Sequence, residues 1–400
     1  MAHEPTYHAQ LIYRVDAHPS APRSSTEHCL SHTLVQTRVL SVAVDCRKIS
    51  HYGIGNVVRS IVTALGDAGF HVTAFGVASE IRTFYPRIKV IPFEIHHNNP
   101  FAYLYLKQVL RRNPEFDCWI SPHYVGVWPL EFQLSNREHR LPIICYLHDL
   151  IHLSWPTNFF LPVVSKALIQ NMVKSVDLVL TPSDYTRQVA KQHGFDSTSW
   201  QILSPPVSED FLRVVRDLQH KPPPQRDEYY LCVTSSLKPH KGVSNLIKIW
   251  RSDYPPLKIV GNVGGIKVGA KTNIHIVPKV PLAELINLYS SAKWVIIPSL
   301  AEGFGYVYLE SRYTLTPVIC RPLPCFNDFK ASVDIVCEDM TDESLQAAIE
   351  LSLSRAPSVD AVEFTEIQAK FDKRLFTTKL KNLVEWVCNA CSSSRLDTSY

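Results

Sequence analysis

The fold of this 400-residue chain is decided by residues 298–310, with the sequence PSLAEGFGYVYLE. They follow the apolar run Trp294 to Ile297, which is typical of a buried strand, and they predict a helix from Gly305 to Tyr313. The glycines of the loop allow the backbone to approach a ligand closely. The start of a helix offers unpaired N–H groups and a positive dipole end, which suit a diphosphate. A strand, a ligand-binding loop and a helix start are therefore expected here.

Two glutamates flank this helix start. Glu302 lies in the loop, and Glu310 lies about one and a half turns into the helix. A carboxylate accepts hydrogen bonds from sugar or ribose hydroxyls, so the pair suits a sugar nucleotide. The alternative is that both are solvated side chains. The preceding strand, the two glycines and a further strand start at 316–318 favour the binding site.

Outward from this stretch, short apolar runs alternate with amphipathic segments, which is typical of doubly wound parallel sheets. The pattern begins with a strand at 39–44, a polar turn over 45–55 and a helix over 57–65. A proline-rich stretch interrupts it and is the best linker candidate. The expected organisation is an N-terminal extension (1–36), a Rossmann-like domain (37–205), the linker (206–228), a second Rossmann-like domain (229–372) and a C-terminal helix (373–400).

The composition excludes several classes of protein. With 46% hydrophobic and 20% charged residues, the chain can form sizeable cores and is not wholly disordered. No run of about 18 apolar residues predicts a membrane-spanning helix, and the N-terminus lacks the apolar core of a secretory signal. The 10 cysteines are scattered and are expected to be reduced in a cytoplasmic protein. A net charge of +4 is too small and too dispersed for a dedicated nucleic-acid binder.

Several motifs, taken in their order along the chain, resemble glycosyltransferase family 4. They are segments 45–47 and 52–56, the His-Asp segment 146–151, the turn 180–186, the loop 236–242, and Glu302, Phe304, Gly305 and Glu310 with seven residues between the glutamates. The resemblance covers about residues 39–391. It implies a retaining, nucleotide-sugar-dependent enzyme of GT-B fold, with two Rossmann-like domains facing a cleft and a last helix that crosses back onto the first domain. No Asp-x-Asp motif is present, so neither a metal nor another cofactor is expected.

The resemblance implies a role for each residue that matches a family motif. Glu310 would bind the ribose, Glu302 the hydroxyls of the donor sugar, and Lys241 the diphosphate. Glu302, His148 and Lys241 are the expected catalytic residues, with His148 near the sugar or the acceptor. The rest of the donor site would comprise Gly303, Phe304, Gly305, Ser235 and Lys238, and the N-terminal glycine loop would comprise Gly53, Ile54 and Gly55.

Three positions depart from the family pattern. Ser235 and His240 stand where many relatives have arginine, and Arg312 stands where small residues are usual. The departures leave a second hypothesis open, in which the chain is a non-catalytic, nucleotide-sugar-binding partner subunit. A GT-B epimerase or phosphorylase is a third alternative. A Rossmann dehydrogenase is disfavoured because no Gly-x-Gly-x-x-Gly follows the first strand.

The substrates are less well defined than the fold. Segments 52–56 and 148–151 resemble mannosyltransferase-like members of polysaccharide pathways, which favours GDP-mannose slightly, with UDP-sugars next. The expected acceptor is a hydroxyl of a glycan or a lipid-linked glycan. An amphipathic helix at 103–112 suits either packing on its own sheet or peripheral contact with an anionic membrane. His148 and His152 are four residues apart, but a strand and a loop are expected there, so no metal site is predicted.

Overall fold

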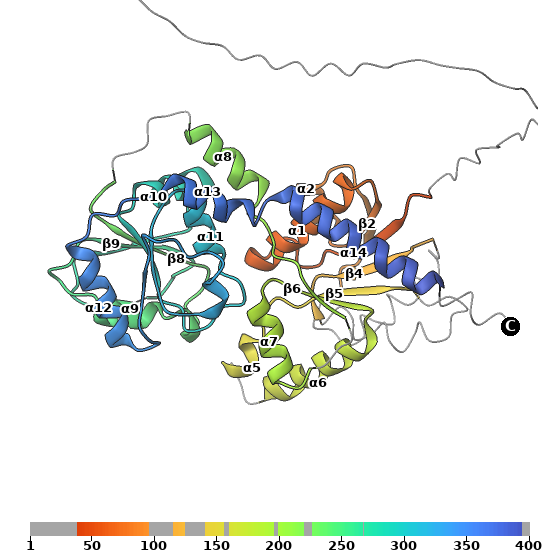
Figure 1. Ribbon diagram of the computed structural model, residues 1–400, viewed down its shortest axis with the longest axis horizontal. Coiled ribbons are helices and arrows are strands. Elements are labelled where there is room, and N and C mark those ends of the chain that lie inside the picture. Colours follow the sequence, from red (N-terminus) through yellow and green to blue (C-terminus); the bar gives the residue numbers. More distant parts are fainter. Residues whose placement is uncertain are drawn as a thin grey trace, which may run out of the picture. The chain divides into compact units, whose positions relative to one another are not determined.

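The computed structural model describes residues 38–95, 115–124, 141–155, 160–195, 199–219, 226–266 and 268–393. Within these residues the chain forms two parallel sheets, each flanked by helices (Figure 1), and the doubly wound α/β fold class is confirmed. The expected N-terminal extension (1–36) and the expected amphipathic helix at 103–112 lie outside the described residues.

The N-terminal sheet has seven parallel strands in the order β3-β2-β1-β4-β5-β6-β7. Strand β5 reads Ile-Ile-Cys-Tyr because both faces of the sheet are covered. The chain order reverses between β1 and β4, and ligands of such sheets bind at the carboxyl ends of the strands beside this point. The strands are β1 (Ser41–Asp45), β2 (His71–Gly76), β3 (Lys89–Pro92), β4 (Cys118–Ser121), β5 (Ile143–Tyr146), β6 (Leu178–Thr181) and β7 (Trp200–Ile202).

Helix α1 (Tyr52–Asp67) begins before the expected residue 57. Gly53 and Gly55 therefore lie in its first turn, and the predicted glycine loop is corrected to a helix start. A Cβ atom at Gly55 would lie 2.4 Å from the carbonyl oxygen of Ile49, so glycine allows the helix to start this close to the preceding turn. The other described helices beside this sheet are α2 (Ala78–Phe84), α5 (Ile151–Ser154), α6 (Phe160–Ser175) and α7 (Asp184–Gln192).

The C-terminal sheet has six parallel strands in the order β10-β9-β8-β11-β12-β13. Its own reversal lies between β8 and β11, so the loops after these two strands meet at one edge. The strands are β8 (Tyr230–Thr234), β9 (Leu257–Gly261), β10 (Ile274–Val277), β11 (Trp294–Ile297), β12 (Val318–Cys320) and β13 (Ile335–Val336). The helices are α9 (Val243–Ile249), α10 (Leu282–Ser291), α11 (Tyr306–Tyr313), α12 (Asp342–Leu353) and α13 (Ala361–Ala369).

The stretch predicted as a linker contains helix α8 (Glu209–Gln219), which corrects that part of the prediction. Val207, Phe211 and Val215 recur at every fourth residue and are buried in the core of the C-terminal sheet. Phe211 and Val215 lie on one face of α8, and Val207 lies just before the helix begins. The prolines on both sides suggest a linker, but the apolar spacing between them is the stronger determinant of local structure.

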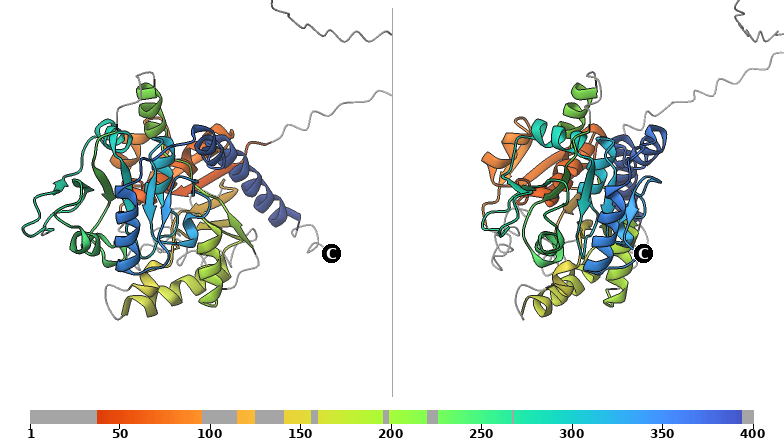
Figure 2. Two further views of the ribbon diagram at one scale, coloured as in Figure 1. Left: turned by 60° about the vertical axis from the view of Figure 1, so that its left-hand side comes forward. Right: turned by 90° about the vertical axis from the view of Figure 1, so that its left-hand side faces the viewer.

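Helix α14 (Lys373–Ser393) returns from the C-terminal sheet and packs on α1, as the views in Figures 1 and 2 both show. Phe376, Leu380, Val384 and Val387 are buried in the core of the N-terminal sheet. Their spacing of three and four residues gives one apolar stripe. The N-terminal core therefore includes the end of the described chain as well as its beginning.

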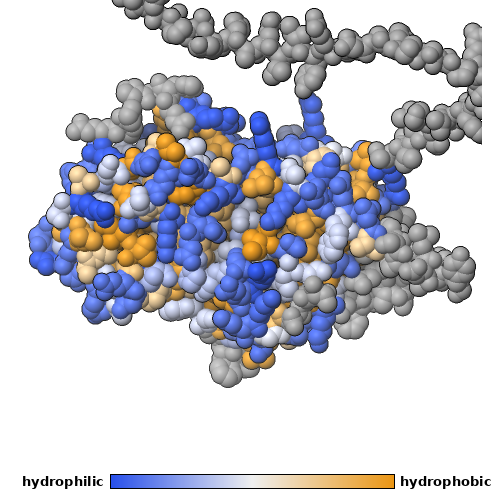
Figure 3. Space-filling view, viewed as in Figure 1, coloured by the Kyte–Doolittle hydropathy of each residue, from blue (hydrophilic) through white to orange (hydrophobic). Residues whose placement is uncertain are grey.

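The described surface is mixed in character. Polar residues and small apolar patches are interspersed over the face drawn in Figure 3. Among the described residues, no helix combines the length and the apolar character that crossing a bilayer requires.

Candidate active site

The loop that decides the fold leaves β11 at its carboxyl end and enters α11 at Gly305. Gly305 has a φ of +112°, a left-handed conformation that glycine adopts without strain. A Cβ atom there would lie 2.7 Å from the ring of Phe326. Conformation and space therefore both require glycine where α11 begins. The expected strand, glycine turn and helix start are all present.

A second loop, which follows β8, packs on the first. The backbone N–H of Leu300 donates to the carbonyl of His240 at 2.7 Å. A Cβ atom at Gly242 would lie 2.1 Å from the carbonyl oxygen of Pro298, so the two backbones are in direct contact. This contact fixes the position of Lys241 relative to the start of α11.

Glu302 and Lys241 form an ion pair across these loops. The Lys241 Nζ atom lies 2.7 Å from Glu302 Oε1, and the Ser299 hydroxyl donates to the same oxygen at 2.8 Å. The two charged side chains are 22% and 15% exposed, so solvent screens the pair only partly. The structure thus places two predicted catalytic residues together, and the glutamate neutralises the lysine.

The N-terminal part reaches this loop through Gly303. Ser183 Oγ and Thr186 Oγ1, at the start of α7, donate to the Gly303 carbonyl at 2.8 and 3.0 Å. A Cβ atom at Gly303 would lie 2.4 Å from the carbonyl oxygen of His148 and 2.7 Å from Asp149 Cβ. Gly303 is therefore the point at which the loop after β11 meets the loop after β5, and a side chain would separate them.

His148 lies at this contact as a neutral base. Its Nε2 atom donates to the Pro122 carbonyl at 2.6 Å, and its ring lies 4.9 Å from the Tyr146 ring. Burial lowers the pKa of His148 to about 4, against the opposing effects of the Pro122 hydrogen bond and the Asp149 charge. Because Nε2 carries the proton, Nδ1 is left as an acceptor for a hydroxyl. The site therefore holds an uncharged imidazole at neutral pH.

Glu310 lies on α11 beneath the glycine turn. Its Oε2 atom accepts a 2.7 Å hydrogen bond from the Tyr289 hydroxyl. Burial raises the pKa of Glu310 to about 7, and the Tyr289 hydrogen bond opposes the rise. This carboxyl is therefore partly protonated near neutral pH.

The first turn of α1 faces the first turn of α11. A Cβ atom at Gly53 would lie 3.9 Å from Cδ2 of Tyr306, an ordinary contact. Tyr306 also packs edge-on against Phe304, with ring centroids 5.3 Å apart, and it contacts the cores of both sheets. Gly53 is thus brought to α11, although as a helix residue, whereas Gly55 lies against Ile49 and Ile54 packs on the core of the N-terminal sheet.

Two of the remaining predicted residues form no hydrogen bond or ion pair with this cluster within the described part of the chain. Ser235 and Lys238 are both exposed in the loop after β8. Arg312, which departs from the family pattern, does not face this cluster. Its side chain is fully buried, pairs with Asp334 at 2.8 Å and lies 4.1 Å from the Phe364 ring. Arg312 therefore belongs to the core of the C-terminal sheet.

Sequence reasoning missed several residues of the site. Tyr289 and Tyr306 lie in segments read only as helix, and no local signal marks them. Ser183 and Thr186 lie in a turn that the sequence singles out, and their hydroxyls three residues apart are a readable helix-start signal. Among the residues that the structure describes, no cluster of three His, Cys, Asp or Glu side chains is arranged to hold a metal.

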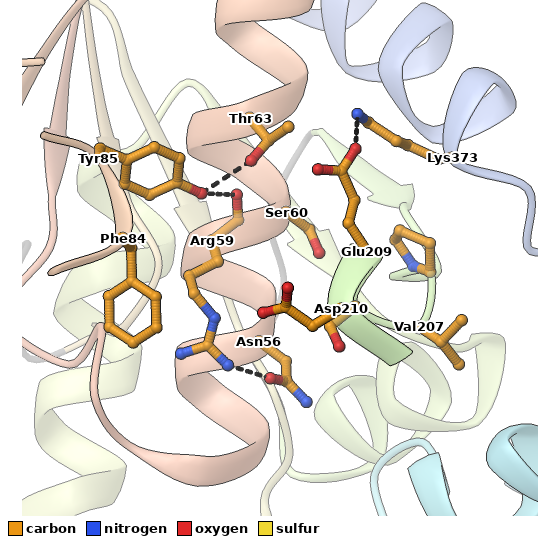
Figure 4. Close-up of a pocket in the computed structure, with 12 residues that line it drawn as sticks. Asn56, Arg59, Ser60, Thr63, Phe84, Tyr85, Val207, Glu209, Asp210 and Lys373 are labelled. Carbon is orange, nitrogen blue, oxygen red and sulfur yellow. Dashed lines mark hydrogen bonds and ion pairs between the residues drawn. The ribbon is translucent and has the colours of Figure 1, made fainter. Parts of the chain in front are cut away.

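A separate pocket lies between α1, α2 and the start of α8 (Figure 4) and includes none of the predicted site residues. Its polar groups are already engaged. The Tyr85 hydroxyl bonds Thr63 at 2.8 Å and the carbonyl of Arg59 at 2.7 Å, and Lys373 pairs with Asp67 and Glu209. These bonds hold the helices around the pocket together. The predicted catalytic residues lie elsewhere, at the contact around Gly303.

Comparisons with known proteins identify relatives of both halves of the described chain. Residues 52–211 match the family described as Glycosyltransferase Family 4, and residues 215–362 match the family described as Glycosyl transferases group 1. The O-antigen chain mannosyltransferase RfbU of Salmonella typhimurium is 25% identical over 275 residues, which cover 64% of this chain and 74% of that protein. The two family matches meet close to α8, where the second sheet begins.

Solved structures share the fold. Sucrose-phosphate synthase from Thermosynechococcus elongatus matches 88% of this chain and 100% of its own, with a TM-score of 0.71 at 15% identity. HepE from Anabaena, in complex with UDP-glucose, matches 86% of this chain and 99% of its own, with a TM-score of 0.65 at 15% identity. The two Rossmann-like sheets of this chain and the match of such structures over most of its length confirm the expected GT-B fold.

Proposed function

Because this chain belongs to glycosyltransferase family 4, we propose that it transfers a sugar from a nucleotide-diphosphate sugar to a hydroxyl of a glycan or glycolipid. We propose further that it retains the anomeric configuration, requires no metal, and takes GDP-mannose in preference to UDP-sugars. The observation that carries the proposal is the 2.7 Å pair of Lys241 and Glu302 at the start of α11, closed by the contact of Gly303 with the N-terminal part.

Lys241 is the proposed cation for the diphosphate. Negative charge develops on the diphosphate as the sugar departs, and preorganised cations and backbone N–H groups stabilise that charge. Lys241 would exchange Glu302 for the diphosphate when the donor binds. Glu302, still held by the Ser299 hydroxyl, would then accept hydrogen bonds from the donor sugar.

Glu310 is the proposed partner of the ribose. A ribose hydroxyl that donates to this carboxyl favours its ionised form, against the burial that raises its pKa to about 7. His148, neutral and on the opposite loop, would accept from a hydroxyl of the sugar or the acceptor. The nucleotide would thus be held by the C-terminal part, and the reacting sugar would lie at the contact between the two parts.

The donor preference rests on the curated relative. RfbU is described as an O-antigen chain mannosyltransferase, which supports mannose as the sugar. GDP as its carrier stays a prediction. HepE was solved with UDP-glucose, so UDP-sugars are the next candidates. Peripheral contact with an anionic membrane, expected from residues 103–112, stays a prediction.

A second function has one observation in its favour. Lys241 is already neutralised by Glu302, and Ser235 brings no charge to the loop after β8. A chain that binds the nucleotide sugar without transferring it, as a partner subunit, would show the same arrangement. Binding and turnover must therefore be measured separately.

The first experiment is a thermal-shift panel with UDP, GDP, ADP and their common sugar conjugates. A ligand at about 100 times its Kd should stabilise the protein by roughly 2.7 kcal/mol. The shift should be lost in Glu310→Ala and kept in Glu366→Ala, a control at an exposed glutamate of α13. No shift with any nucleotide would contradict the proposed donor site.

The second experiment separates the two functions. Glu302→Gln keeps the shape of the side chain but removes the charge that faces Lys241. Turnover of the donor identified by the panel should fall by about 100-fold or more, while nucleotide affinity changes only a few-fold. A wild-type protein that binds a nucleotide sugar but converts none of it, with any acceptor glycan tried, would favour the partner subunit instead.

A further inference from the structure

Arg321 is the first residue after β12, at the carboxyl edge of the C-terminal sheet, and its side chain is fully buried. Sequence analysis did not single it out. Its Nε atom donates to the carbonyl of Pro298 at 3.1 Å, and its Nη2 atom pairs with Asp342. Its Nη1 atom donates to the carbonyls of Met340 and Thr341. The side chain therefore joins the loop after β11 to the start of α12.

A fully buried guanidinium is a costly way to fill a protein core. Its desolvation is offset only when its donors are bonded, and an apolar side chain of similar volume is often at least as stabilising. Arg312, which is equally buried, leaves Nε and Nη1 without a partner among the described residues. Each nitrogen of Arg321 has a partner. These bonds indicate a joint of defined geometry between the segments that they connect.

The Pro298 carbonyl is the point at which Arg321 reaches the candidate active site. The same carbonyl touches the backbone of Gly242, where a Cβ atom would lie 2.1 Å from the oxygen. Lys241 immediately precedes Gly242, and the loop that follows Pro298 carries Glu302. A shift of this carbonyl would therefore move the cation of the site relative to the start of α11.

A second connection runs from Arg321 to the segment that carries Lys241. Asp342 also accepts a 2.7 Å hydrogen bond from the side chain of Asn245, in the first turn of α9. Helices α9 and α12 pack side by side (Figure 1). Arg321 thus holds this segment at two points, at Gly242 through the Pro298 loop and at Asn245 through Asp342.

We propose that Arg321 is a positioning residue of the donor site, which sets the place of Lys241 for the diphosphate through the Pro298 carbonyl. The inference rests on the proposed function, in which Lys241 neutralises that diphosphate. Because Arg321 is fully buried, it does not touch the donor, and its effect passes through Lys241. The joint therefore acts on recognition of the phosphorylated part of the donor and not on recognition of the nucleoside.

The test is calorimetric titration of wild type and Arg321→Lys with GDP, UDP, guanosine and uridine. Lysine keeps the charge beside Asp342, but a single ammonium does not replace a planar fork that bonds several acceptors at once. Affinity for the nucleoside diphosphate should fall about tenfold, and affinity for the nucleoside should change less than about twofold. The kcat with the donor found in the thermal-shift panel should fall by about 10- to 100-fold.

A double-mutant cycle shows whether Arg321 acts through Lys241. Lys241→Met removes the cation and should itself weaken diphosphate binding. If Arg321 only positions that cation, adding Arg321→Lys to Lys241→Met should cause no further loss of diphosphate affinity. Fold-changes that multiply in the double variant would overturn the inference, because the arginine would then act independently of the lysine.

Two controls separate positioning from stability. Tyr230→Phe removes a buried 2.7 Å hydrogen bond between β8 and Ser352 of α12, so it should lower the Tm without changing the ratio of diphosphate to nucleoside affinity. If Arg321→Lys does not fold, Asn245→Ala replaces it in every titration and in the cycle, because it loosens the joint at its half-buried end. It should weaken the diphosphate about threefold, whereas Ser244→Ala, at its exposed neighbour, should bind like wild type.

The outcomes separate this inference from the proposed function. A wild-type protein that binds no nucleotide overturns both. A wild-type protein that binds GDP or UDP, with Arg321→Lys equal to it for the diphosphate, overturns only the role of Arg321. Equal weakening of nucleoside and nucleoside diphosphate also overturns that role, because the arginine would then act on the fold and not on the placement of Lys241.

Discussion

Replacing Gly303 by alanine should uncouple the two parts of the protein while leaving each part folded. The added Cβ atom would lie 2.4 Å from the His148 carbonyl oxygen and 2.7 Å from Asp149 Cβ. The closest neighbour is backbone and cannot rotate away. The loop after β11 must therefore move away from the loop after β5 by about 1 Å to reach an ordinary contact distance.

The size of the effect follows from the bonds that this movement breaks. The Gly303 carbonyl accepts from Ser183 at 2.8 Å and from Thr186 at 3.0 Å. Each such bond contributes about 0.5–1.5 kcal/mol, so the closed contact should lose about 1–3 kcal/mol. That range corresponds to a roughly 5- to 150-fold smaller ratio of closed to open protein. Transfer, which needs the closed contact, should fall by the same factor.

The assay compares kcat with nucleotide Kd for Gly303→Ala, using the donor found in the thermal-shift panel. We expect kcat to fall, Kd to change less than about threefold because Glu310 and Lys241 are untouched, and Tm to change little. Gly264→Ala is the matched control, because a Cβ atom there meets nothing within 4 Å.

Wild-type kcat in Gly303→Ala would refute the reasoning, because the contact would then be dispensable for transfer. A fall in kcat would also refute it if the Tm measured without ligand fell by an amount that corresponds to the same loss of about 1–3 kcal/mol. The loop would then be part of the core of the C-terminal part and not a contact that opens and closes.

Two other predictions concern α11. Burial raises the pKa of Glu310 to about 7, so the carboxyl stabilises the fold below its unfolded pKa of 4.5, and this contribution is lost as the pH rises through 7. The Tm of Glu310→Gln minus the Tm of wild type should therefore be larger at pH 8 than at pH 5. An equal difference at both pH values would contradict this. The Tyr306 hydroxyl is buried with no partner among the described residues, whereas the Tyr308 hydroxyl donates to Asp334 at 2.7 Å. Tyr306→Phe should keep or raise the ligand-free Tm, and Tyr308→Phe should cost about 1 kcal/mol, with equal losses in denaturant titrations counting against the assignment.

The sequence predicts elements whose signal is local. The apolar run at 294–297 and the glycine at 305 identify β11 and the start of α11, because a buried strand and a left-handed turn each constrain residue type directly. The same holds for most strands of both sheets, and their alternation with helices is sufficient to predict the fold class. The glutamate spacing then predicts the loop at which Lys241 and His148 are brought close to Glu302 and Gly303.

Features that depend on distant partners could not be predicted in this way. Arg312 departs from the family pattern, and only the folded chain brings Asp334 and Phe364 to it. Gly303 looks like a residue that admits a ligand, whereas the structure uses its missing side chain to admit the backbone of His148. The prolines on both sides of α8 suggest a linker, and the helical spacing of its apolar residues is explained only by the burial of Phe211 in the core of the C-terminal sheet.

The charges of the site explain why ligand binding and closure should be coupled. Within the described residues, Glu302 neutralises Lys241 on one side of the contact, and Arg47 neutralises Asp45 on the other. A ligand changes a conformational balance only through interactions that differ between the states. A diphosphate held at the start of α11 would lie beside the first turn of α1 only while Gly303 is docked on His148. The charge of the diphosphate would therefore favour the closed contact at Gly303. When the diphosphate leaves, the contact would open.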